Sequence, residues 1–443
     1  MDSIDASQTR ERPKANLNAV NEDGKSPLYF AAANGRDTIV KTFIKLGAKV
    51  DLATEDGRTP LYMASWMGHK DIVVKLISKG ARPDVSIEDG SSPLYAAAWN
   101  GHEDIVDILT KEDIDINKPN SENETPIYVA AESNYYNIVE KLIASGANLS
   151  IASIEFGPPL TIAAKTGCCA IVQKLLEDKS ALKDNPKALY FAAENGYGDV
   201  VKALIDSKAD VNMVHEEFGL PLCAAALKGH NSIVQMLLDA NADVNLRTED
   251  GRTPLYVAAE SGHLDVVLKL IDGHAKIDLT TDEGKTPYII AAENGHSDIV
   301  KILISHHVEI NRTSTSGRTA LDLAVANGHA NVVQMLINSG CNVARATEDG
   351  RTPLYIAANN GHSTIIPMLI EANCAVDGAT LSGATPLFAA VSSNKKEAVE
   401  QLIKASADVN MAREDGMAPL FVAAENGFIA IVRLLINAGA NVN

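Results

Sequence analysis

Apolar and polar positions follow one pattern that returns along most of the chain. In the copy at 248–280, Leu255, Ala258 and Ala259 share one helical face, and a second apolar stripe follows over 264–271. The pattern predicts two short helices per copy, with small alanines that allow close packing. Each copy can bury its apolar faces only against its neighbours.

Capping residues mark the two ends of the first predicted helix in each copy. Thr253 and Pro254 open the first helix as N-cap and first residue. Gly262 ends that helix in the left-handed conformation. Asn134 and Asn394 take this position in two other copies, and Asn also tolerates the left-handed region. The tight-turn dipeptide Asp250-Gly251 precedes the pair and predicts a projecting finger.

The repeat length is constant at 33 residues, except for one step of 29 between Leu160 and Leu189. A fixed period in this range is typical of a solenoid. The position of Leu255 is filled in turn by Leu28, Leu61, Leu94, Ile127, Leu160, Leu189, Leu222, Leu255, Tyr288, Leu321, Leu354, Leu387 and Leu420.

The recurring string Asp-Gly-x-Thr-Pro-Leu-x-x-Ala-Ala-x-x-Gly-His, followed by Ile-Val-x-x-Leu-Ile and Gly-Ala-x-Val-Asn, resembles the ankyrin repeat over roughly 21–443. The resemblance implies an all-α solenoid of stacked helix-turn-helix units with β-hairpin fingers, curved with a concave groove. Proteins of that family are mostly non-catalytic binding scaffolds. The chain departs from the family after the Leu, where the usual His is Tyr at 29, 62, 95, 128, 190, 256 and 355.

We expect two segments in the chain. Residues 1–20 are predicted to be a disordered N-terminal lead-in with the tail of a partial repeat, and 21–443 to be the ankyrin-repeat domain. The repeats are expected to start near 21, 54, 87, 120, 153, 182, 215, 248, 281, 314, 347, 380 and 413.

Composition narrows the classes of partner. With 39 basic and 57 acidic residues the chain has a formal net charge of −18 at pH 7, which argues against nucleic acid and anionic membranes as partners. The five cysteines form no CxxC pair, which favours free thiols in a reducing compartment. No apolar run approaches the ~18 residues of a membrane helix, and the N-terminus lacks a signal-peptide core. A soluble cytoplasmic protein is expected.

Candidate chemistry is mostly explained by the repeat. Gly284-Lys285-Thr286 and Gly24-Lys25-Ser26 lack the first Gly of a phosphate-binding loop and align with finger turns. His306-His307 has no third ligand for a metal. Cys168-Cys169 at a helix start allows a reactive thiol, although small helix residues are the favoured interpretation. Seven histidines recur in Gly-His pairs, as framework residues would: 69, 102, 230, 263, 296, 329 and 362. We therefore expect no enzyme activity, no cofactor and no metal.

Breaks in the pattern are the candidate binding positions. Just before the helix-ending Gly, where most copies have small or polar residues, the second and third repeats carry Trp66-Met67 and Trp99-Asn100. The equivalent position in adjacent repeats predicts that the two indoles lie side by side on the groove face. Exposed Trp is a common interface anchor, and its truncation typically costs ~2–4 kcal/mol. The alternative is that the tryptophans shield the cores of the first repeats.

The short step marks a second break. The finger between Leu182 and Lys187 lacks four residues, and its neighbours carry Phe156 and Phe218 at their tips. The two rings either form an apolar notch or fold inward to fill the gap, and we favour inward folding. A third irregularity, Pro367 inside a second helix, is expected to remove one backbone bond and to bend that helix.

Paired acidic residues recur at the fingertips and form the last candidate site. Stacked fingers would align these pairs into an acidic rim that attracts a basic partner. A merely solvating edge is an equally good explanation. The pairs are Glu55-Asp56, Glu88-Asp89 and Glu249-Asp250, with equivalents at 216–217, 282–283, 348–349 and 414–415.

Three functions remain open at this point. The leading one is a protein–protein interaction scaffold or adaptor that binds its partner in the groove and along the acidic rim. The second is the substrate-recognition arm of a larger enzyme or complex. The third is a host-directed microbial effector, which the sequence does not separate from the first. The oligomeric state stays open.

Overall fold

A computed structural model of the chain describes residues 16–182, 185, 187–214 and 219–442. These residues form 26 α-helices and one short 3-10 helix, η1 (Lys179–Leu182), and two isolated β-bridges join Ser153 with Gly157 and Thr313 with Thr319. The structure is thus the predicted all-α solenoid of helix pairs.

The chain forms two compact units. One comprises the residues up to Ala192 with Tyr197–Ala209, and the other comprises Ala193–Gly196 with the residues from Asp210 onward. Helix α11 crosses the boundary. The helices of the first unit are α1 Pro27–Ala33, α2 Asp37–Lys45, α3 Pro60–Trp66, α4 Lys70–Ser78, α5 Pro93–Trp99, α6 Glu103–Leu109, α7 Pro126–Glu132, α8 Tyr136–Ala144, α9 Pro159–Lys165, α10 Cys169–Leu176, α11 Lys187–Glu194 and α12 Gly198–Asp206.

The second unit repeats the same arrangement. Its helices are α13 Pro221–Leu227, α14 Asn231–Asp239, α15 Pro254–Ser261, α16 Leu264–Asp272, α17 Pro287–Glu293, α18 Ser297–Ser305, α19 Ala320–Ala326, α20 Ala330–Asn338, α21 Pro353–Asn360, α22 Ile365–Glu371, α23 Pro386–Ser392, α24 Lys396–Lys404, α25 Pro419–Glu425 and α26 Ile429–Asn437.

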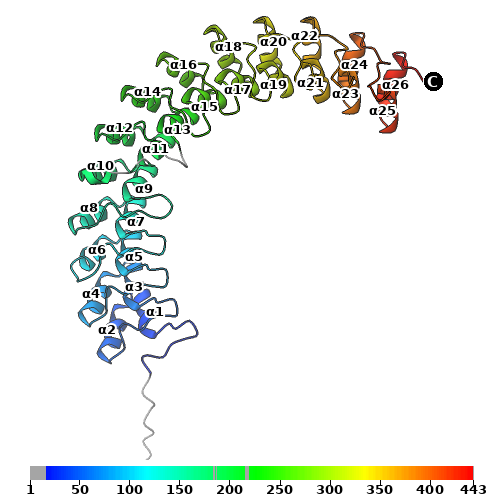
Figure 1. Cartoon of the computed structure of the whole chain (residues 1–443). Helices are drawn as coiled ribbons and strands as arrows, with labels where there is room; N and C mark the ends of the chain where they lie inside the picture. The colour runs from blue at the N-terminus through cyan, green and yellow to red at the C-terminus, as the bar shows by residue number, and fades with distance from the viewer. Residues whose placement is uncertain (1–15, 183–184, 186, 215–218, 443) are drawn as a thin grey trace, which may run out of the picture. The chain divides into compact units, whose positions relative to one another are not determined.

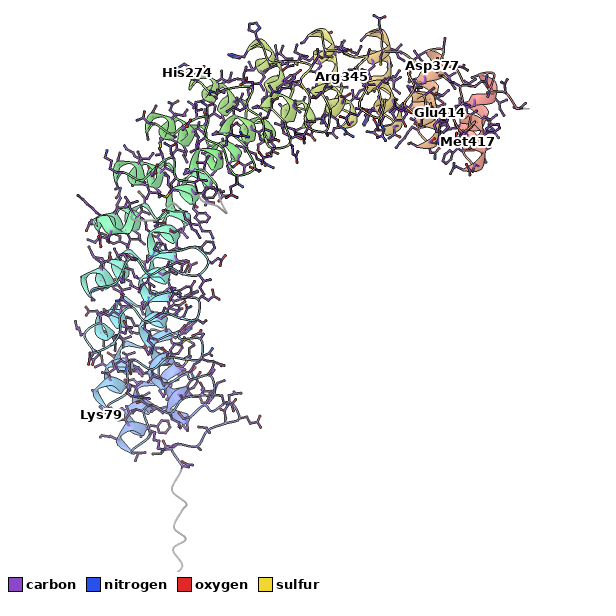
Figure 2. All side chains as sticks on the ribbon, viewed as in Figure 1. Lys79, His274, Arg345, Asp377, Glu414 and Met417 are labelled. Atoms are coloured by element: carbon purple, nitrogen blue, oxygen red, sulfur yellow. The ribbon has the colours of Figure 1, made fainter. Side chains whose placement is uncertain are left out.

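Within each unit the helices form two rows. The first helix of each repeat packs on the first helix of the next, and the second helices do likewise (Figure 1). The fingers lie on the free side of the first-helix row. Lys79 in the first unit and His274 in the second lie on the opposite side, at the ends of second helices (Figure 2).

Local sequence explains where the first helices begin. In nine repeats a Ser or Thr side chain accepts the N–H of the third helical residue, as Thr253 does from Tyr256 at 3.2 Å. Pro254 follows at the first helical position. Gly262 ends α15 with φ +79°, while Asn134 and Asn394 have φ +60° and +54°. The predicted start and stop signals are confirmed.

The fingers are simpler than the expected β-hairpins. Each is a tight turn, as in the one that Thr54 N–H closes on the Arg58 carbonyl at 3.0 Å. Neighbouring tips are joined by single bonds, such as Glu88 N–H to the Asp56 carbonyl at 2.9 Å. With so few residues per finger, no ladder of strands develops among the described residues.

The repeated histidines join each repeat to the one before it. In all seven, Nε2 lies 2.9 to 3.1 Å from a backbone carbonyl 36 residues earlier, as in His329 with Glu293. The ring covers the helix-ending glycine of that earlier repeat, which for His329 is Gly295. Tyr135 covers Gly101 in the same way where the His is absent. The histidines are framework residues, as predicted.

Pro367 has part of the predicted effect. Helix α22 begins only at Ile365, two residues later than α20 begins in the preceding repeat. The backbone is already helical at Thr364, and the Ile366 N–H bonds to the His362 carbonyl. Proline lacks the N–H that would make the next bond of this series, to Ser363, so one backbone bond is missing, as predicted. The expected bend of the helix stays a prediction.

The shortened step is closed locally by η1. Ala181 of this helix is buried, and the side chain of Asn185 accepts a hydrogen bond from Thr161 Oγ1 at 2.8 Å. Thr161 occupies the position that is Tyr in other repeats. A smaller side chain and a polar contact thereby replace the missing finger.

Candidate binding surface

Trp66 ends helix α3 and is half-buried. Its ring stacks on Tyr62 of the same helix, with ring centroids 6.2 Å apart. It also packs against a buried cluster that includes Tyr29 and Met63. The next residue, Met67, is 48% exposed. Trp66 therefore shields part of the core of the first repeats, and Met67 faces solvent beside it.

Trp99 ends helix α5 and is more open. It is 39% exposed, and its ring lies against Tyr95 with centroids 5.8 Å apart. Asn100 is half-buried, and its side-chain amide donates to the Ala96 carbonyl at 2.9 Å. Each indole pairs with a tyrosine of its own helix. Trp99 with Met67 makes the larger apolar contribution to the surface here.

The tyrosines beneath the indoles are part of the core. Tyr62 is 3% and Tyr95 4% exposed. Burial raises the pKa of the Tyr62 phenol to about 12 and also raises that of Tyr95, whose O–H donates to Glu124 at 3.0 Å. Rigid, neutral side chains thus support both tryptophans.

The acidic residues at the fingertips of the first unit differ in exposure and in their contacts. Glu55, Glu88 and Asp89 are exposed, whereas Asp56 is half-buried in its turn. Asp56 accepts a hydrogen bond from Thr54, which lowers the pKa of its carboxyl, and it pairs with Arg58 at 3.1 Å. Asp89 accepts the Ser91 N–H at 2.7 Å. The aspartates hold the turns, and the glutamates remain free to meet a partner.

The finger at 248–252 in the second unit follows the same division. Burial alone would raise the pKa of Asp250, but bonds from Thr248 at 2.5 Å and Arg252 at 2.7 Å outweigh it and lower that pKa. Glu249 is exposed. In the fingers at 54–58 and 248–252, one carboxylate of the acidic pair is therefore ion-paired with an arginine of the same finger, which lowers the charge that this part of the predicted rim offers.

Phe156 folds inward. Its ring meets Phe191 of α11 edge-on at 6.0 Å, and the Lys165 ammonium lies 3.2 Å from its centroid. Such a cation–π contact covers the ring face. The ring thus packs on its own unit, which is the favoured of the two predictions. Phe218 lies outside the described residues, as does the Glu216-Glu217 pair.

The remaining candidates for chemistry are the cysteine pair at 168–169 and the histidine pair at 306–307. Cys168 is buried, and burial raises the pKa of the Cys169 thiol, which makes it less reactive, not more. His307 takes φ +63° at the end of α18, where other repeats have Gly. Among the described residues no group of three or more His, Cys, Asp or Glu side chains is arranged to hold a metal ion.

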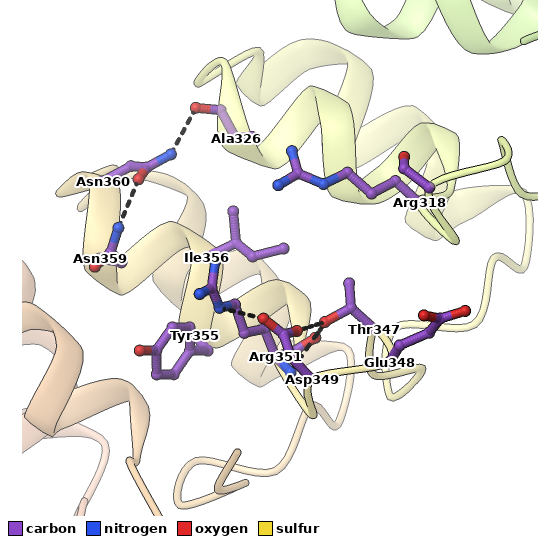
Figure 3. A pocket seen from close by; sticks show the side chains of 11 residues that line it. Arg318, Ala326, Thr347, Glu348, Asp349, Arg351, Tyr355, Ile356, Asn359 and Asn360 are labelled. Carbon is purple, nitrogen blue, oxygen red and sulfur yellow. Dashed lines mark hydrogen bonds and ion pairs between the residues drawn. The ribbon is translucent and has the colours of Figure 1, made fainter. Parts of the chain in front are cut away.

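The structure adds a site that the sequence analysis missed. A pocket of about 390 Å³ lies among α19, α21 and the finger that precedes α21 (Figure 3). The sequence indicates this site only indirectly. Arg318 and Arg351 occupy a finger position that is basic in several repeats, while the acidic residues near that position differ from repeat to repeat. Its lining includes Arg318, Glu348, Asp349, Arg351, Tyr355 and Asn360.

Comparison with known families agrees with this architecture. The family model described as ankyrin repeats (3 copies) matches residues 9–87, 82–153, 154–215, 189–281, 268–347 and 354–443. The model described as ankyrin repeats (many copies) matches 331–370. No curated protein was found to match the chain. None of the helices in the described part combines the length and the apolar character needed to span a bilayer.

Proposed function

Because the chain belongs to the ankyrin-repeat family, we propose that it is a non-catalytic scaffold or adaptor that binds a protein partner on the finger side of its first helices. Repeats of this family generally mediate protein–protein interaction. The proposed contact surface is formed by Trp66, Met67 and Trp99, with the exposed glutamates Glu55 and Glu88 on the neighbouring fingers.

One observation carries the proposal. The last turn of α5 exposes 39% of Trp99, and Met67 at the end of α3 is 48% exposed. The first helices of these adjacent repeats pack on each other. A rigid aromatic ring and a flexible thioether, exposed at the ends of packed helices, are residue types typical of interface anchors. Water would otherwise hydrate this apolar surface at a cost.

Charge complements this anchor. Glu55 and Glu88 stand at adjacent fingertips, and the tips are joined through the Asp56 carbonyl. A partner with basic residues near an apolar patch would be attracted before contact, so its association rate would fall with salt. Asp56 contributes less to this attraction, because it pairs with Arg58.

The cysteines support a reducing compartment such as the cytoplasm. All five are free thiols, and Cys168, Cys223 and Cys374 are buried. Secreted domains usually pair their cysteines. We include this location in the proposal.

Partner capture from lysate tests the proposal with three variants. Trp99→Ala and Met67→Glu remove exposed apolar surface without opening the core, and each is expected to reduce capture at least ~30-fold, as loss of a ~2 kcal/mol anchor would. Tyr136→Ala is the matched control, since this exposed ring stands at the start of the second helix α8. Equal capture by Trp99→Ala, Met67→Glu and the wild type, with circular dichroism unchanged, would refute the proposal.

A further inference from the structure

Two repeats of the second unit contain an ion pair between a finger and the first helix that follows it. Arg252 Nη1 lies 3.1 Å from Glu260 Oε2, and Lys285 Nζ lies 2.8 Å from Glu293 Oε2. Arg252 also pairs with Asp250 in its own finger. The basic side chain thus lies between a carboxylate on the finger and one at the end of the first helix.

The next repeat has the basic finger residue but neither of the two acidic residues that pair with it in the repeats before. Arg318 occupies the position of Arg252, but Ser316 replaces the finger acid and Ala326 replaces the helix glutamate. Within the described residues the Arg318 guanidinium makes no hydrogen bond or ion pair. It is half-buried, so its charge is only partly hydrated. A partly desolvated guanidinium without a directly bonded anion can still accept a carboxylate as an ion-pair partner.

The repeat after that has the acidic finger residue but not the acidic residue at the end of the first helix. Arg351 pairs with Asp349 of its finger through Nε at 2.8 Å, but Asn359 stands where the helix glutamate would be. The Arg351 guanidinium also lies over the Tyr355 ring, 6.0 Å from the centroid. Its outer N–H groups remain available as donors. Two adjacent repeats therefore both lack the carboxylate at the helix end.

The two arginines line the same pocket of about 390 Å³. In Figure 3 the Arg318 side chain runs toward Ile356 and Asn360, whereas Glu348 points to the other side. Asp349 is engaged by Thr347 at 2.5 Å and by Arg351, and the Thr347 bond holds the pKa of its carboxyl below the usual range. The acids in the lining thus make no ion pair with the Arg318 guanidinium, although its charge also acts on the buried carboxylate of Asp322 in α19.

We propose that this pocket binds a carboxylate side chain of an acidic segment in a protein partner, held by Arg318 and the free N–H groups of Arg351. The carboxylate takes the place that Glu260 and Glu293 fill in the two preceding repeats. The inference rests on the proposed function in that the ligand is a protein. It adds a second contact, in which basic residues of this chain meet acidic residues of the partner. This contact lies in the second unit, whereas Trp99 lies in the first.

The neighbouring repeats also identify the anion as a carboxylate. They place a glutamate on this basic position at 3.1 and 2.8 Å. A guanidinium matches a carboxylate through two parallel N–H bonds. Nucleic acid is disfavoured, because it would bring a continuous row of phosphates against a chain with a net charge of −18, whereas a carboxylate side chain brings one charge to the pocket.

Fluorescence anisotropy with a defined probe tests the inference. The probe is a labelled peptide in which three glutamates alternate with glycines, and its counterpart carries glutamines. We expect Arg318→Gln to weaken glutamate-peptide binding at least about threefold at low salt. Ala326→Glu restores the internal pair and should weaken it as much. Ala326→Gln controls for size, and Arg252→Gln controls for loss of a paired arginine; both should leave the Kd unchanged.

Several results would overturn the inference. They are equal binding of the glutamine peptide, full binding by Ala326→Glu, and tighter binding of a phosphoserine peptide of the same spacing. The same titration on Trp99→Ala separates the two proposals, since the pocket lies in the other unit and its Kd should not change. Loss of peptide binding in Trp99→Ala alone would place the acidic ligand elsewhere.

Discussion

Replacing Gly295 with Ala tests how strongly one repeat is coupled to the next. Gly295 has φ +79°, and a Cβ at this residue would lie 2.6 Å from Nδ1 of His329. Nε2 of that ring lies 2.9 Å from the Glu293 carbonyl. The added methyl group must therefore displace the ring from its acceptor. Gly340 is the matched control, because its φ is +81° and a Cβ there meets nothing within 4 Å.

The two substitutions should differ by the value of the histidine contact. Both force Ala into the left-handed region, which costs about 1–2 kcal/mol. Gly295→Ala also loses the hydrogen bond to Glu293, worth about 0.5–1.5 kcal/mol net. We expect Gly295→Ala to cost about 1 kcal/mol more than Gly340→Ala. In the His329→Ala background the ring is absent, so the two costs should become equal.

Native-state hydrogen exchange measures these costs locally. A solenoid can open repeat by repeat, so the free energy of opening is read from the amides of α17 and α19. Equal costs of Gly295→Ala and Gly340→Ala in the wild-type background would refute the coupling. An excess that persists in His329→Ala would show that the strain has another source.

Three further predictions concern single residues. Ala418 is the N-cap of α25 without a side-chain bond, so Ala418→Thr should stabilise that helix by about 0.5–2 kcal/mol in hydrogen exchange. Burial raises the pKa of Asp322, so its contribution to stability is full below the ordinary aspartate pKa and is lost as pH rises through the higher folded value. The urea midpoint of the wild type should therefore fall relative to that of Asp322→Asn between acid and neutral pH, and parallel curves would contradict this. Burial raises the pKa of Cys223 to about 12, so mass spectrometry should find iodoacetamide on it only after denaturation.

The helix ends could be predicted because they depend on neighbouring residues. Thr253, Pro254 and Gly262 act through local backbone geometry, and the sequence contains all of that information. Pro367 is an intermediate case. The loss of one backbone bond follows from the residue itself, but the late start of α22 at Ile365 was not predicted. The helix still buries Leu369, and such burial depends on neighbouring repeats that the local sequence does not describe.

The candidate surface was only partly predictable for a similar reason. The positions of Trp66 and Trp99 follow from the repeat, but their unequal exposure depends on the buried cluster beneath Trp66. The pairing of Asp56 with Thr54 and Arg58 was not predicted, because it depends on side-chain geometry within one turn. Arg318 was not identified from the sequence, because it differs from Arg252 only in having Ser316 and Ala326 where acidic residues pair with the basic side chain.

Hydroxyl-radical footprinting of the captured complex tests the central claim most directly. Trp66, Met67 and Trp99 are oxidisable, and Met67 and Trp99 are exposed in the free protein. We predict that their oxidation falls when the partner binds, while that of Met411 in the second unit, 36% exposed, does not. Unchanged oxidation of Met67 and Trp99 in a complex that forms would contradict the account.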